Sequence, residues 1–308
     1  MTKTVFIDGG AGTTGLEIAD RLAGRPDLSI LTLPDDRRKD ADARREAIND
    51  ADFVILCLPD DAAREAVSLI ANDRTRVVDA STAHRTAPDW VYGFAELEPD
   101  QAERIAEARF VSNPGCYPTG FLALVRPLVR AGIVPADWPI SVNAASGYSG
   151  GGKAMIAEYE SATNRAFRPY GLSLAHKHAP EMQRHSGLTH APIFAPAVVD
   201  TYRGMVVEVP LPLHALPGAP TLETVAAVLA DAYADGRVVS FAPGDVAAVN
   251  IEENARTDRM TLRLCGNAAT GQARLIATLD NLGKGAGGAA VQNLNIMAGL
   301  DPTAGLVL

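Results

Sequence analysis

With 308 residues, 47% hydrophobic and 21% charged, the chain is long enough for two globular domains that each bury a core. A net charge of −9 and the lack of a basic stripe with interleaved aromatic residues argue against nucleic acid as a partner and favour a small molecule. The longest apolar runs, such as Phe53–Leu58, are far shorter than the roughly 20 residues that cross a membrane, so no membrane partner is expected.

The N-terminus and the cysteines indicate a cytoplasmic protein. Met1–Thr4 leads directly into Val5–Ile7 without the pattern of a secretion signal. The three cysteines, Cys57, Cys116 and Cys265, are odd in number and lack metal-ligand spacing. We therefore expect neither disulfides nor a bound metal.

The first half of the chain alternates short β-rich runs with helix-like patterns, which predicts a doubly wound parallel sheet of the Rossmann type. The expected strands are Lys3–Asp8, Ser29–Leu33, Phe53–Leu58, Arg76–Ala80 and Arg109–Asn113. The expected helices are Gly15–Ala23, Ala41–Asn49 and Ala62–Ala71.

After residue 140 the pattern changes to longer strands, which predicts a second domain with a mixed or antiparallel sheet. Its expected strands are Tyr202–Leu211, Met260–Cys265 and Arg274–Leu279, with helices at Lys153–Ala162 and Leu222–Ala234. A last helix over Gly287–Leu300 is expected to return to the first domain. The predicted domains are residues 1–115 with the C-terminal helix at about 285–308, and residues 116–284.

A glycine-rich loop, Gly10–Gly15, follows the first strand with the G-x-G-x-x-G spacing of dinucleotide-binding proteins. Gly10 would permit a tight turn, Gly12 the close approach of a pyrophosphate and Gly15 close helix packing. Thr13 and Thr14 would begin a helix whose free N–H groups bind phosphate. The alternative is a glycine turn with no ligand, which the strand and helix on either side make less favourable.

About 20 residues later, where such proteins recognise the ribose, the chain reads Pro34–Lys39. Asp35 and Asp36 are compatible with NAD, whereas Arg37 and Arg38, next to Lys39, could bind a 2′-phosphate. We favour NADP as the cofactor. The alternative is a solvated charged loop.

The segment Val111–Gly120 carries the strongest chemical signal. A strand runs into a Pro-Gly turn, and an apolar helical pattern begins just after Cys116. A helix N-terminus favours thiolate over thiol and lowers a cysteine pKa from about 8.5 towards neutrality, so Cys116 is expected to be a nucleophile. Cys57 and Cys265 lie within apolar strands and are expected only to pack.

Two further segments carry polar groups suited to such chemistry. His176–Glu181 offers two imidazoles with a matching pKa, and Pro180 suits the first turn of a helix that would place both histidines at its entrance. Ser146–Lys153 is a second glycine-rich loop before a helix, and its N–H groups and Lys153 could hold a phosphate or carboxylate. Helix capping and a flexible turn are the respective alternatives.

Taken together, the motifs resemble those of the N-acetyl-γ-glutamyl-phosphate reductase family, in its shorter type, along nearly the whole chain. The elements of the resemblance are Ile7–Gly15, Val78–Ser81 with Arg85, Tyr92–Leu97, Asn113–Thr119, Ser146–Lys153, His176–Glu181, Asp280–Ala286 and Val291–Asn293. It implies an NADP-binding Rossmann domain joined to a glyceraldehyde-3-phosphate-dehydrogenase-like α+β catalytic domain. It also implies a cytoplasmic homodimer or homotetramer that acts in arginine biosynthesis.

The resemblance also implies a reaction and roles for residues. Cys116 attacks the acyl phosphate, phosphate leaves, and hydride from NADPH reduces the thioester to the semialdehyde, while His178 or His176 handles the proton; we favour His178. The residues implied in substrate binding are Arg85, Ser149, Lys153 and Glu181. Those implied in cofactor binding, besides the glycine loop and the arginines, are Ser81, Asn281, Gly285 and Asn293.

The chain departs from the longer type of the family at Lys153 and Lys177, where arginine is expected, and at Thr82–His84. Lysine cannot reproduce the bidentate fork of arginine, which affects the details of substrate binding. Aspartate-semialdehyde dehydrogenase and an aminoadipyl-phosphate reductase remain alternatives within the enzyme class. A non-catalytic nucleotide sensor is the alternative of another class, although Cys116 and the histidine pair argue against it.

Overall fold

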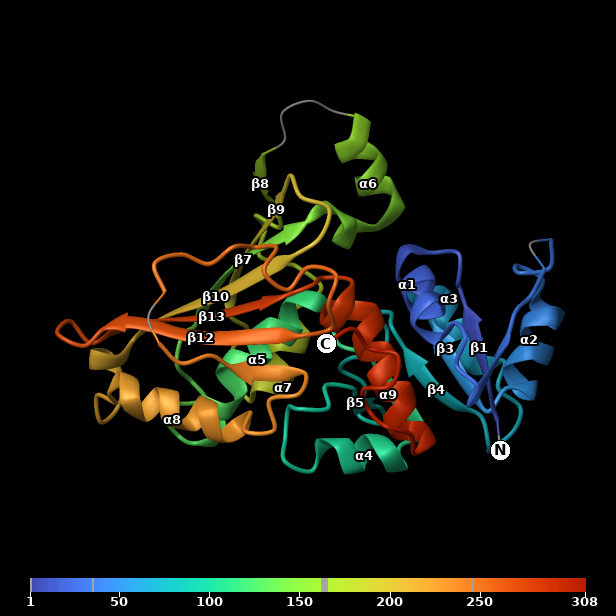
Figure 1. Cartoon of the computed structure of the whole chain (residues 1–308), viewed down its shortest axis with the longest axis horizontal. Coiled ribbons are helices and arrows are strands. Elements are labelled where there is room, and N and C mark those ends of the chain that lie inside the picture. The colour runs from blue at the N-terminus through green and yellow to red at the C-terminus, as the bar shows by residue number, and fades with distance from the viewer. Residues whose placement is uncertain (1, 35, 162–165, 245) are drawn as a thin grey trace. The chain divides into compact units, whose positions relative to one another are not determined.

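The computed structural model describes residues 2–34, 36–161, 166–244 and 246–308, and the chain forms two compact units (Figure 1). Unit 1 contains Met1–Gly115 and Ala286–Leu306, and unit 2 contains Cys116–Gly285 and Val307–Leu308. Within the described ranges, no helix is long and apolar enough to cross a membrane.

Unit 1 is built on a six-stranded sheet of order β2-β1-β3-β4-β6-β5, in which all neighbours are parallel. Its elements are β1 (Lys3–Asp8), α1 (Thr13–Leu22), β2 (Leu28–Leu31), α2 (Ala41–Asp50), β3 (Phe53–Leu56), α3 (Asp60–Ser68), β4 (Arg76–Asp79), β5 (Val91–Tyr92), α4 (Gln101–Glu107), β6 (Phe110–Ser112) and α9 (Gly288–Ala298). The Rossmann-type doubly wound sheet predicted from the sequence is confirmed.

Helices cover both faces of this sheet because consecutive strand residues point to opposite sides. Val5, Ile55 and Val78 pack in a core cluster with residues of α1, α4 and α9. Their chain neighbours Phe6, Val54 and Val77 pack in a second cluster with residues of α2 and α3. Burial on both faces explains why these strands read as continuous apolar runs.

The structure refines the elements expected in unit 1. Each expected strand is present, although β2 already ends at Leu31 and β6 spans only Phe110–Ser112. The short strand β5 and the helix α4 carry too weak a pattern to have been predicted. The helix expected over 287–300 is present as α9, which packs on α1 and α4.

Unit 2 contains a seven-stranded mixed sheet of order β11-β12-β13-β10-β7-β9-β8. Its elements are α5 (Cys116–Arg130), β7 (Ser141–Gly147), η1 (Tyr148–Gly151), α6 (Gly152–Ser161), β8 (Phe167–Pro169), α7 (Ala179–Ser186), β9 (Ile193–Val199), β10 (Met205–Pro212), η2 (Leu213–Ala215), α8 (Leu222–Ala232), β11 (Val239–Phe241), β12 (Met260–Asn267), β13 (Gln272–Leu279) and η3 (Gly283–Gly287). The predicted α+β second domain is confirmed in class, with four more strands (β7, β8, β9 and β11) than the pattern predicted.

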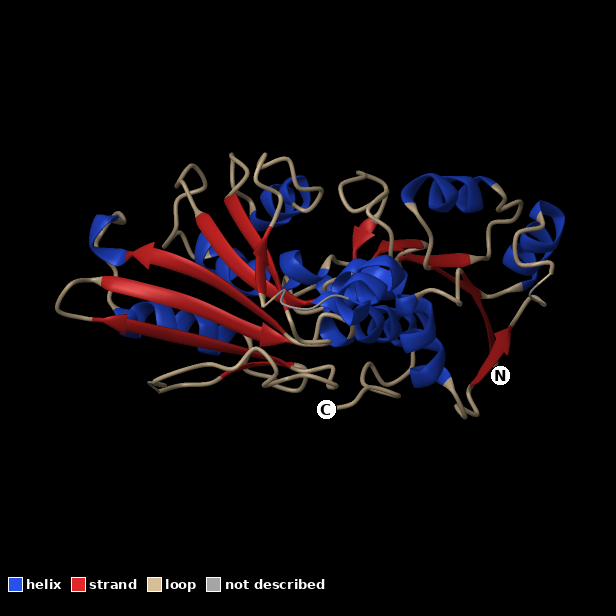
Figure 2. Cartoon of the chain, turned by 90° about the horizontal axis from the view of Figure 1, so that it is seen from above, coloured by secondary structure: helices blue, strands red, loops and turns tan. Residues whose placement is uncertain are grey.

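Helices α5 and α8 pack on one face of this sheet, and α7 packs on α5 (Figures 1 and 2). A Cβ added to Gly120 of α5 would lie 2.7 Å from the side chain of Val207 on β10, so a glycine is required for this close approach. On the opposite face Asn143 and Ala195 are exposed. The helix expected over Lys153–Ala162 is present as α6, and Ala162 lies outside the described residues.

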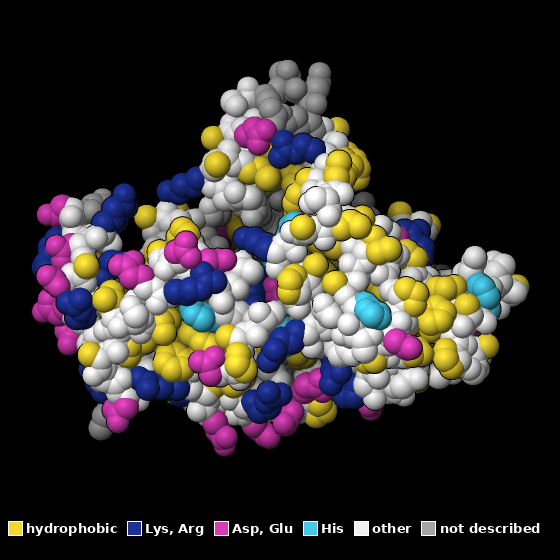
Figure 3. All heavy atoms as spheres, turned by 180° about the vertical axis from the view of Figure 1, so that it is seen from behind, with side chains coloured by type: hydrophobic (Ala, Val, Ile, Leu, Met, Phe, Trp, Pro, Cys, Tyr) yellow, Lys and Arg dark blue, Asp and Glu magenta, His cyan; other side chains and the backbone are white. Residues whose placement is uncertain are grey.

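The surface differs between the units. Of the nine large hydrophobic side chains exposed on the described residues, eight belong to unit 2. Figure 3 shows the hydrophobic side chains of one face in yellow. Large exposed apolar areas are uncommon on monomeric proteins and mark contact surfaces.

Candidate active site

The glycine loop of unit 1 links β1 to α1 at the carboxyl end of the sheet. The strand order reverses here, since β1 lies between β2 and β3, and such a switch point is where open parallel sheets bind ligands. Gly9, the residue before the motif, adopts a positive φ of +85°, and a Cβ there would lie 2.3 Å from the carbonyl oxygen of Cys57. The turn therefore requires a glycine one residue before the motif as well.

Gly12 and Gly15 have different structural roles. A Cβ on Gly15 would lie 2.6 Å from the Cα of Gly10, so close helix packing requires glycine there. A Cβ on Gly12 would approach only the Gly9 carbonyl, at 3.3 Å. Gly12 is the N-cap of α1 and provides no capping side chain, so the first N–H groups of the helix, at Thr13 and Thr14, receive no capping bond from it. This arrangement suits a phosphate.

The basic residues after β2 lie on the surface. Arg37, Arg38 and Lys39 are exposed, as is Asp36, while Asp35 lies outside the described residues. Exposed guanidinium groups remain accessible to a phosphate. Nearby, Asp8 at the end of β1 accepts hydrogen bonds of 3.0 Å from Nε and Nη2 of Arg44 on α2, which ties the helix to the strand.

Ser81 and Arg85 belong to the loop after β4. Ser81 donates its N–H and its hydroxyl to the buried carboxylate of Asp79, at 2.8 and 2.7 Å. His84 Nδ1 binds the same carboxylate at 2.6 Å, and the His84 ring stacks on Trp90. Arg85 is buried, and its Nε and Nη2 donate to the main-chain carbonyls of Asn113 and Ala80.

Asn293 of α9 is buried in unit 1 beside Asn113. Its Nδ2 donates to the Gly93 carbonyl at 2.8 Å and to Asn113 Oδ1 at 3.0 Å. Asn113 Nδ2 in turn donates to the Ala286 carbonyl at 3.0 Å. The Oδ1 atom of Asn293 is buried and has no hydrogen-bond partner among the described residues, so it is available to a ligand.

In unit 2, Cys116 is the first residue of α5, as the Pro-Gly turn predicted. Gly285 lies directly against it, because a Cβ on Gly285 would be 2.9 Å from the Cβ of Cys116. The other cysteines differ: burial raises the pKa of Cys57 to about 12, which disfavours its thiolate, and Cys265 lies on β12.

The histidine pair forms an aromatic cluster with the residue after Cys116. The ring of Tyr117 lies 5.9 Å from that of His178 and 6.3 Å from that of His176, and the two imidazoles are 4.8 Å apart. His178 is the N-cap of α7 and Pro180 lies in its first turn, as the sequence predicted. Glu181 is also buried in this turn.

Hydrogen bonding and burial favour a neutral His176. Its Nδ1 accepts the backbone N–H of His178 at 3.1 Å, which places the proton of the neutral ring on Nε2. Burial, together with the charge of Lys177, lowers the pKa of His176. Near Cys116, the pKa of Tyr170 is raised to about 12, mainly by burial and also by the charge on Cys116.

Three N–H groups of the second glycine-rich loop, which we expected to be open to a ligand, are engaged within the protein. The N–H groups of Gly147, Tyr148 and Ser149 donate to the carbonyls of Gly204, Thr201 and Tyr202, at 2.9, 2.9 and 3.2 Å. Lys153, on the following helix, is exposed. The Lys153 ammonium remains accessible to an anion. The three N–H groups are not accessible, because they already donate to main-chain carbonyls.

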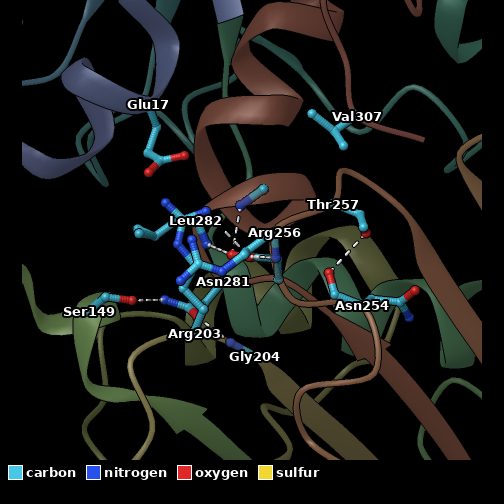
Figure 4. Close-up of polar contacts among 12 residues, drawn as sticks. Glu17, Ser149, Arg203, Gly204, Asn254, Arg256, Thr257, Asn281, Leu282 and Val307 are labelled. Carbon is cyan, nitrogen blue, oxygen red and sulfur yellow. Dashed lines mark hydrogen bonds and ion pairs between the residues drawn. The ribbon is translucent and has the colours of Figure 1, made fainter. Parts of the chain in front are cut away.

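Asn281 links this loop to the turn before β10 (Figure 4). Its Nδ2 donates to Ser149 Oγ at 2.9 Å, and its Oδ1 accepts the N–H of Gly204 at 3.0 Å. The adjacent carboxylate of Asp280 accepts the N–H groups of Leu282 and Gly283. Among the described residues, no group of three or more His, Cys, Asp or Glu side chains could hold a metal.

Sequence reasoning missed the aromatic residues of the cluster. Tyr117 donates to the carbonyl of Ala197 on β9, Tyr170 donates to the Tyr117 hydroxyl at 3.4 Å, and Phe194 packs edge-on against both Tyr117 and His176. The position of Tyr117 next to Cys116 was a usable signal. Tyr170 and Phe194 come from distant segments, and no spacing in the sequence brings them to the cysteine.

Comparison with known proteins follows the division into two units. The semialdehyde dehydrogenase NAD binding domain matches residues 4–105, and the semialdehyde dehydrogenase dimerisation domain matches residues 116–281. N-acetyl-gamma-glutamyl-phosphate reductase of Brucella anthropi is 53% identical over 97% of this chain and 99% of that protein. The chain belongs to the N-acetyl-γ-glutamyl-phosphate reductase family. The same-named protein of Brucella ovis is 52% identical over 97% of this chain and 100% of its own length.

Membership of the N-acetyl-γ-glutamyl-phosphate reductase family confirms the resemblance and identifies the chain as an oxidoreductase. Solved structures with the same fold include aspartate semialdehyde dehydrogenase II of Vibrio cholerae, with a TM-score of 0.72 and 15% identity over 97% of this chain and 98% of that one. Aspartate semialdehyde dehydrogenase of Candida albicans, solved with NADP, has a TM-score of 0.67 and 14% identity over 97% and 99%. At these identities the likeness extends to the fold alone.

Proposed function

We propose that the chain catalyses NADPH-dependent reduction of N-acetyl-L-glutamyl 5-phosphate to N-acetyl-L-glutamate 5-semialdehyde with release of phosphate, as a step of arginine biosynthesis. The observation that carries this proposal is the position of Cys116, at the start of α5 and beside the cluster of Tyr117, His176 and His178. The similarity of the whole chain to the Brucella reductases supports the choice of substrate.

Unit 1 has the features that a dinucleotide requires. Gly12 and the N-terminus of α1 would hold the pyrophosphate, with Gly10, Thr13, Thr14 and Gly15 shaping the loop. Arg37 and Arg38 would bind the 2′-phosphate, which favours NADP over NAD. When bound, the nicotinamide supplies the hydride that reduces the acyl group.

Residues held in place by hydrogen bonds would complete the cofactor site. The buried Oδ1 of Asn293 would accept a hydrogen bond from the carboxamide, because no described residue donates to it. Ser81 is fixed by Asp79 and would present its loop to the cofactor. We also assign cofactor binding to Asn281 and Gly285 of unit 2.

Cys116 acts as the nucleophile. Its thiolate is stabilised by the N-terminus of α5, and its sulfur attacks the acyl carbon while the bond to the phosphate oxygen breaks and phosphate leaves. Hydride transfer to the thioester carbonyl gives a thiohemiacetal, whose collapse breaks the C–S bond and releases the aldehyde and the thiolate.

The two histidines have different roles. His176 is neutral with its proton on Nε2, so it donates a hydrogen bond to a substrate oxygen. His178 then delivers and removes the proton on the thiohemiacetal oxygen, as the acid and base of the reaction. Arg85, Ser149, Lys153 and Glu181 contact the substrate, with Arg85 and Lys153 supplying positive charge for its phosphate and carboxylate.

The protein assembles as a homodimer or homotetramer in the cytoplasm. The match of residues 116–281 to a dimerisation domain supports contact through unit 2. This unit also carries the exposed apolar side chains of Phe167, Leu172 and Leu174. The odd number of cysteines in the sequence fits a reducing compartment.

The test is phosphate-dependent reduction of NADP by purified protein with N-acetylglutamate 5-semialdehyde. Aspartate semialdehyde, the aminoadipate semialdehyde analogue and NAD are assayed in parallel, together with Cys116→Ala. We expect turnover with the acetylglutamyl substrate and NADP that is lost in Cys116→Ala. Turnover of another aldehyde in preference would correct the substrate, and NADP binding without turnover of any aldehyde would indicate a sensor.

A further inference from the structure

The turn after β4 contains the segment Thr82–His84, at which the chain departs from the longer type of its family. The proposed mechanism gives this segment no part, although Arg85, one of the cations assigned to the substrate, follows it directly. The side chain of His84 is only 13% exposed and contacts both Asp79 and Trp90. A histidine held on two sides in this way is more than a solvated turn residue.

The buried carboxylate of Asp79 joins the two ends of this turn. Its Oδ2 atom accepts the Ser81 hydroxyl at 2.7 Å and lies 2.6 Å from Nδ1 of His84. An ionised carboxylate only accepts hydrogen bonds, so Nδ1 of His84 is the donor. One buried oxygen therefore fixes residues 81 and 84 to each other, immediately before Arg85.

The burial of Asp79 makes the turn depend on His84. The Asp79 side chain is fully buried, and within the described ranges His84 is the one side chain at ion-pair distance from it. A buried carboxylate is costly unless its oxygens are hydrogen-bonded or paired with a cation. Without His84 the Oδ2 atom would need water or another donor, and the turn would rearrange to supply one.

The ring of His84 also rests on Trp90. The two rings are stacked, with centroids 4.1 Å apart and planes 9° apart. Trp90 is buried in the core cluster that unit 1 forms with residues of α2 and α3, and the ring of Phe110 lies 5.1 Å from it. The stack limits the rotation of the imidazole, so that its Nδ1 stays directed at Asp79.

Arg85 takes its orientation from the same residues. Its Nε donates to the Asn113 carbonyl at 2.9 Å, and its Nη2 donates to the Ala80 carbonyl at 3.1 Å. Ala80 is the residue after Asp79, and the Asn113 N–H donates to the Asp79 carbonyl at 2.7 Å. Both carbonyls that orient the guanidinium are thus tied to the residue that binds His84. The plane of a guanidinium decides how it meets two phosphate oxygens, so a shift of the turn weakens that contact.

We propose that His84 is a positioning residue of the phosphate site, and that its Nδ1–H bond to Asp79 holds the turn in which Arg85 presents its guanidinium to the phosphate of the substrate. In this role His84 acts through Arg85 and not by contact with the reacting atoms. Ser81 keeps its own N–H bond to Oδ1 of Asp79, at 2.8 Å, so the cofactor site depends less on His84. The inference rests on the proposed function, in which Arg85 contacts the substrate.

The test measures the phosphate-dependent reduction of NADP and determines kcat and the KM values for phosphate and NADP. His84→Ala removes the donor, whereas His84→Asn keeps an N–H close to the position of Nδ1, because both nitrogens are bonded to Cγ. Phe110→Leu loosens the packing of Trp90 without changing a donor to Asp79, and it controls for a purely structural loss. Arg85→Ala gives the effect of losing the guanidinium. If His84→Ala does not fold, His84→Gln takes its place, since its amide lies one carbon further from the backbone.

We expect His84→Ala to raise the KM for phosphate about tenfold, in the same direction as Arg85→Ala, while kcat and the KM for NADP stay within about threefold. His84→Asn should keep a phosphate KM close to that of the unchanged protein. Phe110→Leu should lower stability in denaturant without raising the phosphate KM. The proposal is overturned if His84→Ala leaves the phosphate KM unchanged, if it raises both KM values alike, or if His84→Asn behaves like His84→Ala.

The binding of inorganic phosphate alone distinguishes this inference from the function on which it rests. The line width of the phosphorus NMR signal of phosphate, titrated with the NADP-loaded protein, requires no aldehyde and no turnover. If the protein turns over no acetylglutamyl substrate, the function fails, and the comparison of His84→Ala with Arg85→Ala by NMR still decides the inference. If turnover is intact but Arg85→Ala binds phosphate like the unchanged protein, the function stands and the inference fails.

Discussion

Two glycine-rich loops, each followed by a helix, differ in what their backbone does. In unit 1 the loop before α1 ends at an N-cap glycine without a capping side chain, which leaves the helix N-terminus available to an anion. In unit 2 the loop before α6 directs the N–H groups of residues 147–149 to carbonyls of the turn at 201–204. The first loop leaves a helix end that suits an anion, and the second loop docks on another loop.

The difference teaches that glycine content alone does not identify an anion site. Gly15 and Gly147 both have no room for a Cβ, but Gly15 is crowded by its own loop, and Gly147 by the carbonyls of Thr201 and Tyr202. In unit 1 the crowding closes a turn around an open helix end. In unit 2 it brings together two segments that are more than 50 residues apart in the sequence. Substitutions at the two glycines should therefore have different consequences.

The largest effect is expected for Gly15→Val. Its Cβ would lie 2.6 Å from the Cα of Gly10, so the loop must open, and we expect NADP affinity to fall about a hundredfold, or about 2.7 kcal/mol. Stability should fall by about 1–3 kcal/mol. Calorimetric titration and denaturant unfolding measure the two losses. Gly10→Ala, whose Cβ meets nothing closer than 3.4 Å, should cost less stability; equal losses would contradict the steric account.

Gly147→Val introduces the same kind of steric clash into the second loop, and its effect on NADP affinity should distinguish the two loops. Its Cβ would lie 2.7 Å from the Tyr202 carbonyl oxygen, and we expect a loss of about 1–3 kcal/mol in unfolding free energy, with NADP affinity unchanged within threefold. The control is Gly151→Ala, where the two nearest crowding atoms are Sδ and Cε at the flexible end of the Met155 side chain. A loss of NADP affinity as large as that of Gly15→Val would remove the distinction between the loops.

Asn281→Ala tests the link between the second loop and its turn. The change leaves the buried Ser149 hydroxyl and the Gly204 N–H without their amide partner, at an expected cost of about 1–3 kcal/mol. Ser149→Ala removes only one of these two bonds and should cost less. Chemical denaturation of both variants gives the comparison, and a smaller cost for Asn281→Ala than for Ser149→Ala would contradict the assignment.

The smallest effect is expected for Lys177→Ala, as a shift in pH dependence. Burial and the charge of Lys177 lower the pKa of His176, so removing that charge should raise the pKa and move the acidic limb of the turnover profile to higher pH. Arg184→Ala removes a positive charge from the following helix and should leave the limb in place. A shift to lower pH in Lys177→Ala would show that the sign is wrong.

The same lowered pKa affects stability. The unfolded chain has the ordinary histidine pKa of about 6.5 and binds the proton first as the pH falls. The stability that His176 contributes is therefore present above about pH 6.5 and decreases below it. His176→Gln should reduce this part of the pH dependence of unfolding.

Much of the fold was predictable because its signals are local. The strands of unit 1 have apolar runs bounded by turns, and Cys116 follows a Pro-Gly turn that ends a strand and begins a helix. The need for glycine at position 9 was not predicted, because the crowding there comes from the Cys57 carbonyl, which follows β3 in a distant part of the sequence. Strands β7 and β9 were not predicted for a different reason, because small residues, with Asn143 and Pro196 among them, interrupt the alternation that identifies a strand.

The candidate site was predictable only where chemistry and spacing coincide. Cys116 and the histidine pair have reactive groups that stand out in any sequence. Tyr170 and Phe194 look like ordinary packing residues, and only the folded sheet brings them to His176. The docking of Gly147–Ser149 on the turn at 201–204 was also out of reach, because main-chain hydrogen bonds between distant loops leave no pattern of side chains.

The most direct test of the central claim is to stop the reaction at the enzyme-bound acyl group. N-acetylglutamate 5-semialdehyde and NADP are mixed with the protein in the absence of phosphate, and the products are followed by absorbance and by mass spectrometry of peptides. We predict a burst of about one NADPH per chain and one acetylglutamyl group on the peptide that contains Cys116, released by added phosphate and absent from Cys116→Ala. An acyl group on another residue, or an equal burst in Cys116→Ala, would contradict the account.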